Sequence, residues 1–505
     1  MTNLRWDLYI VNPIIIIIGL VLAQLISHKN KTSRKKRLFF IEMGLFWVAI
    51  TFLIKINSDA FNALNNSASA LPTSVLVLFA FIGSYILFAA LLNPVAVRWT
   101  FWLRQRRIWI WISNAACFFA TLTGFLISTP NPFNVIILSI LVGVAISSKT
   151  IYFLFCNEQY HERLFPIITS IKCGMVITFA SFIGTEIYSL IIAKTNTFNA
   201  YGTTSLFIIG LICIILSFAI SLMLKERRQN VQKHDDEILE SVQKVNKKVI
   251  IWLMIISFLI GIISALIKTP LFEMYIVAVT KLEYKDNANS LIFLKTYNLF
   301  FLLGQIVLAY IFYKFIIIKI GIIKSISLLT AFLMIGVVLI TFVHNIYLIL
   351  SLTFLFGLML FVTFYIWFGI ALMWNYRVKR SPIIGIYTSL EAIGFLIPYI
   401  IVNILKTYNV GLFQLFKDYE SIFKADITQE KILNNLQSFL SLINNAYYVN
   451  CSLLFVFMGI YLVIVIWIGP KIIAEYNDLD GFKVKLLTIT RKNTEYKMNT
   501  RLVRE

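Results

Sequence analysis

Long, uninterrupted apolar runs are the feature that most constrains this chain. They recur from Leu8 to Ile468, and each is close to the roughly 20 residues that a helix needs to cross the hydrocarbon core of a bilayer. Hydrophobic residues fill 59% of the 505 positions and charged residues only 14%, whereas a soluble domain carries about 25% charged residues. The sequence therefore predicts a multi-pass membrane protein without a separate water-soluble domain.

Thirteen of these runs are predicted to span the membrane. Their length, and the lack of apolar/polar alternation with a period of two, favour helices over an outer-membrane barrel. The predicted spans are 8–26, 38–54, 72–92, 108–127, 134–155, 166–193, 205–224, 250–267, 289–313, 325–343, 346–374, 382–405 and 447–468.

Lysine and arginine are distributed unevenly between alternate connections. One set of connections, which includes the tail after residue 470, holds 32 of them, and the other set holds 10. Because cytoplasmic loops collect these residues, the first set is predicted to face the cytoplasm. The N-terminus is then outside a plasma membrane, with 8–26 as a retained anchor helix. The net charge of +21 reflects this orientation and contact with anionic lipids, not nucleic acid.

The longest charged connection divides the remaining twelve spans into two sets of six. It mixes basic and acidic residues and lacks a hydrophobic core of its own. The sequence thus predicts two six-helix bundles plus one extra N-terminal helix. The predicted units are 1–37 (anchor helix and basic connection), 38–224 (first bundle), 225–249 (linker), 250–470 (second bundle) and 471–505 (basic tail).

Both halves repeat a local pattern between their fourth and fifth helices. Residues 157–168 and 375–384 each contain Asn, then Arg (Arg163 and Arg380), then Pro-Ile-Ile. Proline is common in first turns, so capping alone could produce the match. Its equivalent place in both halves favours a duplicated bundle related by an axis along the membrane normal.

The connections after the second helix of each half are also basic. The first carries Arg98, Arg106 and Arg107, and the second carries Lys319 and Gly321. In these features the chain resembles the major facilitator superfamily, whose loop between helices two and three carries a G-x-x-x-D-R-x-G-R-R motif with a weaker second copy. The resemblance implies alternating-access transport, with these five residues and the arginines of the repeated pattern in gating loops.

The resemblance covers about residues 38–470 and departs from the family pattern. Asn93 stands at the acidic position, no glycine precedes Arg106-Arg107, and the second copy lacks aspartate. In the family this loop joins the two halves when the cavity opens outward, so the departures put that contact in doubt. The extra helix and the usage rich in Ile, Lys, Asn and Phe resemble a divergent branch found in mycoplasmas.

No pattern for covalent catalysis or a metal centre occurs in the sequence. The five cysteines lie in or beside apolar runs without CxxC spacing, and the four histidines lie in loops or at helix ends. Walker, Gly-x-Ser-x-Gly and His-Glu-x-x-His patterns are missing. We therefore expect neither an enzyme nor a cofactor, and transport against a gradient would have to use another gradient.

Charged residues inside the spans are the candidate site residues, because a charge that faces hydrocarbon costs several kcal/mol. Lys295 and Glu391 lie deep in their spans, and Lys55 and Lys268 end the first and seventh core helices. In the superfamily these two helices line the cavity, and its organophosphate exchangers hold a phosphate with a basic residue on each. All four residues are predicted to bind substrate, with Glu391 as the candidate for proton coupling.

Structural interpretations of the same charges remain open at this point. Lys55 and Lys268 could be interfacial lysines, or each could pair with an acidic residue about one turn further on. Lys295 and Glu391 could form an ion pair with each other.

Three more charges, Lys149, Lys172 and Glu42, lie nearer the ends of their spans. All three are within about two turns of an interface, from which a side chain reaches water easily. Snorkelling toward water therefore explains them better than substrate contact does.

The leading prediction is a secondary transporter that moves a small polar solute by alternating access. The solute is expected to be anionic or zwitterionic, because lysines outnumber carboxylates within the bundle, and a proton or another ion would couple uphill transport. The alternative is an exporter of amphiphilic cations or drugs, which would depend on Glu42, Glu186 and Glu391. A membrane enzyme acting on lipid-linked substrates, and a scaffold or receptor, are less favoured.

Overall fold

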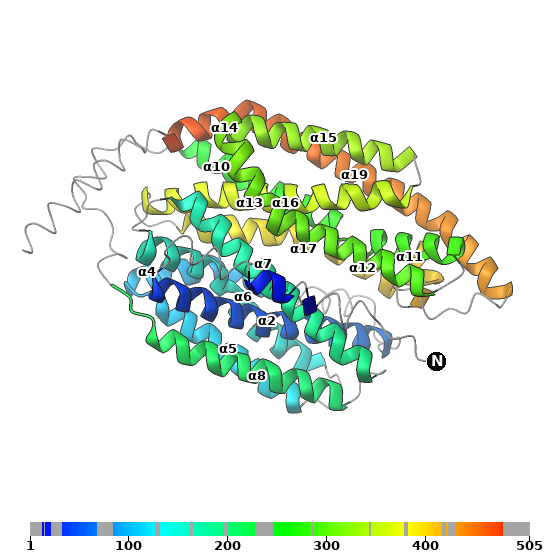
Figure 1. Cartoon of the computed structure of the whole chain (residues 1–505), viewed down its shortest axis with the longest axis horizontal. Coiled ribbons are helices and arrows are strands. Elements are labelled where there is room, and N and C mark those ends of the chain that lie inside the picture. The colour runs from blue at the N-terminus through cyan, green and yellow to red at the C-terminus, as the bar shows by residue number, and fades with distance from the viewer. Residues whose placement is uncertain are drawn as a thin grey trace, which may run out of the picture.

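The computed structural model places long helices in two layers, one for each half of the chain (Figure 1). The structure describes residues 13–14, 16–21, 33–67, 84–126, 132–161, 165–195, 200–227, 246–284, 287–342, 345–377, 382–416, 421–422 and 430–477. Every regular element within these residues is helical, and eleven of the helices are long and apolar enough to cross a membrane. The all-α membrane fold is confirmed, whereas the count of six plus six plus one spans stays a prediction.

The helices follow the apolar runs in chain order. The first layer contains α2 (Arg34–Ser67), α4 (Tyr85–Trp102), α5 (Arg107–Leu126), α6 (Pro132–Tyr160), α7 (Pro166–Thr195) and α8 (Ala200–Met223). The second layer contains α10 (Lys247–Ile267), α11 (Pro270–Tyr284), α12 (Asn287–Leu303), α13 (Ala309–Phe312), α14 (Ile318–Ile320), α15 (Ile322–Phe342), α16 (Ile346–Arg377), α17 (Ile383–Thr407) and α19 (Glu430–Asn477). Two π-helical segments, η3 (Gly304–Leu308) and η4 (Tyr313–Ile317), join α12, α13 and α14, and a 3₁₀ turn, η5 (Gly411–Gln414), follows α17.

The same pairs of helices pack together in both halves. In the first half, α2 packs against α7 and α8, α5 against α6 and α8, and α4 against α6. In the second half, the helices in the same order pair alike: α10 packs against α17 and α19, α15 against α16 and α19, and α12 against α16. Matching pairs are what a duplicated bundle produces, so the packing supports the predicted duplication.

The two halves meet where α4 packs against α17 and α7 packs against α16. A Cβ added to Gly385 would lie 2.7 Å from the Cα of Pro94, and one added to Gly369 would lie 2.6 Å from the Cα of Ile167. These glycines therefore let the backbones of opposite halves touch. Both contacts lie near the α4–α5 and α16–α17 connections, at what we call the basic end of the molecule. The distribution of Lys and Arg predicts that this end is cytoplasmic.

Several helices run past the apolar runs that predicted them. Helix α2 continues to Ser67, α11 fills most of the predicted loop 268–288, and α19 starts inside the predicted loop 406–446. Helix α4 runs far enough that Asn93 and Arg98 lie within it and not in a connection. These loop predictions were wrong because hydropathy marks the part of a helix that lies in hydrocarbon, not the point where the helix ends.

The predicted anchor helix at 8–26 is described only at residues 13–14 and 16–21, which are helical. Gly19 in this segment lies against the ring of Phe179 on α7. The rest of that span, most of the linker and the tail beyond Asn477 lie outside the described residues.

Candidate functional site

Glu391 lies on α17 where that helix touches α10. A Cβ added to Gly261 of α10 would lie 2.2 Å from the Glu391 carbonyl oxygen, and one added to Gly394 would lie 2.3 Å from the Phe258 carbonyl oxygen. The two glycines thus allow backbone contact in both directions, as small residues do between membrane helices. This contact fixes the position of Glu391, whose side chain is half-buried.

Two lysines lie around Glu391, and we call the three residues the Glu391 cluster. Lys149 of α6 and Lys268, which follows α10, both interact electrostatically with Glu391. The Nζ atom of Lys149 lies 4.3 Å from the ring centre of Phe364, and that of Lys268 lies 6.0 Å from the ring centre of Phe395. Aromatic faces attract cations and so hold both ammonium groups in place. The cluster draws on both halves and has two ammonium groups for one carboxylate.

The structure brings the predicted residues Lys268 and Glu391 together. Lys268 lies between α10, which ends at Ile267, and α11, which begins at Pro270, so helix continues beyond it. Lys149 and Glu42 were expected to snorkel toward water, and for Glu42 this was wrong. Lys149 faces aromatic rings of the other half, and Glu42 is fully buried.

Lys55 and Lys295 lie around a different carboxylate, Glu273, in the first turn of α11. Glu273 interacts electrostatically with Lys55 of α2, Lys406 of α17 and Lys295 of α12, and its carboxylate accepts a hydrogen bond from Asn298. We call these five residues the Glu273 cluster. The electrostatic partner of Lys295 is thus Glu273, where the sequence allowed Glu391.

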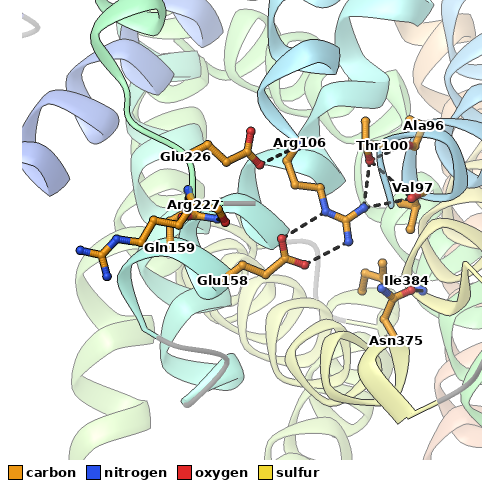
Figure 2. Close-up of polar contacts among 10 residues, drawn as sticks. All are labelled: Ala96, Val97, Thr100, Arg106, Glu158, Gln159, Glu226, Arg227, Asn375 and Ile384. Carbon is orange, nitrogen blue, oxygen red and sulfur yellow. Dashed lines mark hydrogen bonds and ion pairs between the residues drawn. The ribbon is translucent and has the colours of Figure 1, made fainter. Parts of the chain in front are cut away.

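Arg106 forms a buried network at the basic end and is 1% exposed. Its Nε and Nη2 atoms donate to the two carboxylate oxygens of Glu158 on α6 at 3.2 and 3.0 Å. Its Nη1 atom donates to the Val97 carbonyl at 3.0 Å and to the Thr100 hydroxyl at 2.9 Å, both on α4 (Figure 2). A two-bond arginine–carboxylate pair is stronger and more directional than a single hydrogen bond. The network therefore ties the α4–α5 connection to α6.

Glu226, just beyond α8, covers the start of α5. Its two oxygens accept the backbone N–H groups of Arg106 at 2.6 Å and Arg107 at 3.1 Å, which a helix N-terminus favours. Burial raises the pKa of the Glu226 carboxyl, and these two hydrogen bonds oppose the rise. Gln159 and Arg227 exchange hydrogen bonds of 3.0 and 3.4 Å in the same contact. We call these contacts, with those of Arg106 itself, the Arg106 network.

The described hydrogen bonds of Arg106 and Arg107 all lie within the first half, so they do not supply the contact between the halves that the departures from the family motif put in doubt. Glu158 and Glu226 follow apolar spans directly and lie at the same end as the arginines. Acidic residues in such places are the sequence signal that could have predicted their pairing with Arg106 and Arg107. Arg107 also donates from Nη1 to the Leu224 carbonyl at 2.5 Å. Of the other predicted gating residues, Arg98, Lys319 and Gly321 are exposed, and Arg163 and Arg380 lie outside the described residues.

Within the described ranges, no three His, Cys, Asp or Glu side chains are grouped so that they could hold a metal ion. The charged clusters are instead rich in lysine, a cation that binds anions directly.

The chain matches no protein-family model, and no curated protein matches its sequence. Solved structures do match over most of its length. The human organic anion transporter MFSD10 is 10% identical with a TM-score of 0.52, and the match covers 81% of this chain and 100% of that one. A bacterial homologue of the iron transporter ferroportin in an outward-facing state is 14% identical with a TM-score of 0.52, covering 85% and 99%. The proton:xylose symporter XylE is 14% identical with a TM-score of 0.50, covering 84% and 94%.

These likenesses establish the fold. The chain is a multi-pass membrane protein with the fold of the major facilitator superfamily. No match supports the narrower assignment to a mycoplasma-type branch.

Proposed function

We propose that this chain is a secondary transporter, not an enzyme, that moves a small anionic or zwitterionic metabolite across the plasma membrane by alternating access. The observation that carries the proposal is the Glu391 cluster. It joins Lys149 of the first half to Lys268 and Glu391 of the second half, within helices that cross the membrane. A site shared by two halves can close around a solute and open when the halves rock.

The charge balance of the cluster favours an anionic group on the solute. Two ammonium groups face one carboxylate, and a surrounding of low dielectric constant strengthens their attraction for a further negative charge. A carboxylate or phosphate could bind between Lys149 and Lys268, while Glu391 could accept an ammonium group or a coupling proton. The side chains of the cluster thus suit either an anion or a zwitterion.

The route to this cluster leads from the end opposite the basic end. At the basic end the halves are in backbone contact through Gly385 and Gly369. The Glu273 cluster lies toward the opposite end, since Lys406 is in the last turn of α17, whose first turn lies at the basic end. Its lysines would attract an anion before the anion reaches Glu391.

Uptake into proteoliposomes tests the proposal, once a thermal-shift screen of phosphorylated sugars, nucleosides, amino acids and vitamins has identified a ligand that stabilises the protein. Lys149→Gln and Lys268→Gln should each lower initial uptake by roughly tenfold or more, the effect of losing about 1.4 kcal/mol. Lys471→Gln, at an exposed lysine near the end of α19, is the matched control and should transport normally.

Two outcomes would contradict the proposed solute class. Uptake that is unchanged in both lysine variants would exclude the cluster as the binding site. Loss of transport of an amphiphilic cation in Glu391→Gln, with the lysine variants still active, would favour the exporter instead.

A further inference from the structure

Glu42 of α2 is enclosed within the first half. Its side chain is 0% exposed, and its Oε1 atom accepts from the Tyr152 hydroxyl of α6 at 2.7 Å. The Ser217 hydroxyl of α8 lies 3.1 Å from the same oxygen, whereas Oε2 is buried without a hydrogen-bond partner. A carboxylate held in this way, with one oxygen unpaired, pays a desolvation cost of several kcal/mol.

The Ser217 hydroxyl is shared between two acceptors, Glu42 and Asn114. Asn114 of α5 donates from Nδ2 to the Ile110 carbonyl at 3.0 Å, which leaves its Oδ1 atom as an acceptor. The Ser217 hydroxyl lies 3.0 Å from this Oδ1 and 3.1 Å from the Glu42 oxygen, but it has a single proton to donate. A proton on Oε1 of Glu42 would allow both contacts at once, because Glu42 would then donate to Ser217 and Ser217 to Asn114.

The helices packed against α2 bring no described cation to Glu42. The titratable groups nearby are Tyr152 and Tyr160 from α6 and, beside Tyr152, Cys117 from α5, all of them uncharged at neutral pH. Helix α8 contributes only a hydroxyl, and Lys172 of α7 interacts with the start of α2. Burial, the unpaired Oε2 atom and the lack of a described cation therefore all favour the neutral form of this carboxyl.

The helices that surround Glu42 are also the helices that hold the Arg106 network. Helix α5 supplies Asn114 and the Arg107 amide, α6 supplies Tyr152 and Glu158, and α8 supplies Ser217 and is followed by Glu226. The two residues of each pair are six to nine positions apart in the sequence. A charge placed at Glu42 would therefore act on the packing of all three helices close to the network.

We propose that Glu42 is a proton-binding site and that its bound proton stabilises the Arg106 network. When Glu42 releases the proton to water, a carboxylate without a cation remains among α2, α5, α6 and α8. The cost of burying it is relieved only if these helices separate and admit water. The proton is thus a ligand of the packed first half, and lowering its concentration shifts the protein toward a state in which the Arg106 network is loosened.

Infrared difference spectroscopy of the purified full chain tests the protonation. The wild-type protein at pH 7 should show the carbonyl stretch of a protonated carboxylic acid that Glu42→Gln lacks. Glutamine keeps the shape and the hydrogen-bonding capacity of the neutral acid but cannot ionise. Glu42→Asp, which keeps an acid group at a shifted frequency, serves if the glutamine variant does not fold. A Glu42 that is ionised at pH 7 would overturn the proposal.

Hydrogen exchange tests the link to the network. The amides of residues 105–110 include those that Glu226 accepts, and their protection is compared between the wild type and Glu42→Gln after correction for intrinsic rates. Protection should be equal at low pH, and the wild type should exchange roughly tenfold faster at a pH that ionises Glu42. The equivalent turn of the second half, residues 321–326, is the internal control and should show no difference.

Equal exchange in the two proteins at every pH would overturn the link. Neither measurement requires a transported solute. Failure of this proposal can therefore be told apart from failure of the proposed transport function.

Discussion

The connections after the second helix of each half differ, although they occupy equivalent places in matching sets of helices. In the first half, Arg106 is 1% exposed and is bonded to Glu158, and Glu226 covers the helix that follows. In the second half, Lys319 and Gly321 are exposed, and the chain turns at Gly321 with φ of 99°. The helix packing has thus stayed symmetric, while a buried polar network is described only in the first connection.

The two connections therefore have different structural roles. A buried arginine with five hydrogen bonds resists any rearrangement that would expose it or leave its acids unpaired. A glycine turn only reverses the chain. We therefore expect substitutions in the first connection to affect the whole first half, and substitutions in the second to have local effects.

The largest expected effect comes from breaking the buried ion pair. Arg106→Met leaves Glu158 buried without its cation and should lower stability by about 3–5 kcal/mol. Lys319→Met, at the exposed counterpart, should change stability by less than about 0.5 kcal/mol. Thermal unfolding of both variants in the same detergent measures the difference. The double variant Arg106→Met with Glu158→Leu should recover part of the loss. Equal losses of stability in Arg106→Met and Lys319→Met would contradict the proposed difference between the two connections.

Substitutions at the turn residues of the two connections should have smaller effects, and their effects on stability should be opposite in sign. Gly321 has φ of 99° and ψ of 154°, a region open essentially to glycine alone, so Gly321→Ala should destabilise the protein by about 1–3 kcal/mol. The first connection turns at Arg104, with φ of 55°, where an L-residue costs roughly 1–2 kcal/mol. Arg104→Gly should therefore be neutral or stabilising. Unfolding midpoints that fall in both variants would contradict this reading of the turns.

Much of the fold could be predicted from the sequence, because apolar runs near 20 residues leave a membrane chain few alternatives. The ends of the helices could not. Helix α19 continues far beyond its predicted span because polar residues extend a helix in water as readily as apolar ones do in lipid. Hydropathy indicates whether a residue favours lipid or water, whereas the backbone hydrogen bonds that define a helix form in both surroundings.

The candidate site was predictable in part for the same reason. Glu391 stood out because a charge deep in an apolar run is costly, and Lys268 because it ends the seventh core helix, which lines the cavity in the family that the chain resembles. Lys149 did not, because distance along a helix says nothing about the direction of a side chain, and Lys149 faces Phe364 across the two halves. Lys295 interacts with Glu273 and not with the predicted partner Glu391. Which charged residues become partners depends on which helices pack together, and this is a property of the tertiary structure.

The smallest expected effect concerns the connections between the fourth and fifth helices, which differ in titratable groups. The first contains His161, whose Nε2 atom accepts from Lys36 Nζ at 2.5 Å and whose Nδ1 atom bonds the Thr169 hydroxyl. Its counterpart at 377–382 contains no histidine. Burial, and then the charges of Lys36 and Lys172, lower the pKa of His161 to about 4. The folded protein thus stabilises the neutral imidazole of His161, the form that can accept a hydrogen bond from Lys36.

The pH dependence of stability follows from this shift. Above pH 6.5 the imidazole is neutral in both the folded and the unfolded chain, so His161 adds no pH dependence. As the pH falls from about 6.5 to about 4, the unfolded chain binds a proton that the folded protein does not, and stability declines. Because the ring is only half-buried, solvent screening limits the loss to about 1 kcal/mol. Unfolding at pH 7.5 and pH 5 should show a larger loss for the wild type than for His161→Gln, and equal losses would mean that the ring is already protonated in the folded protein.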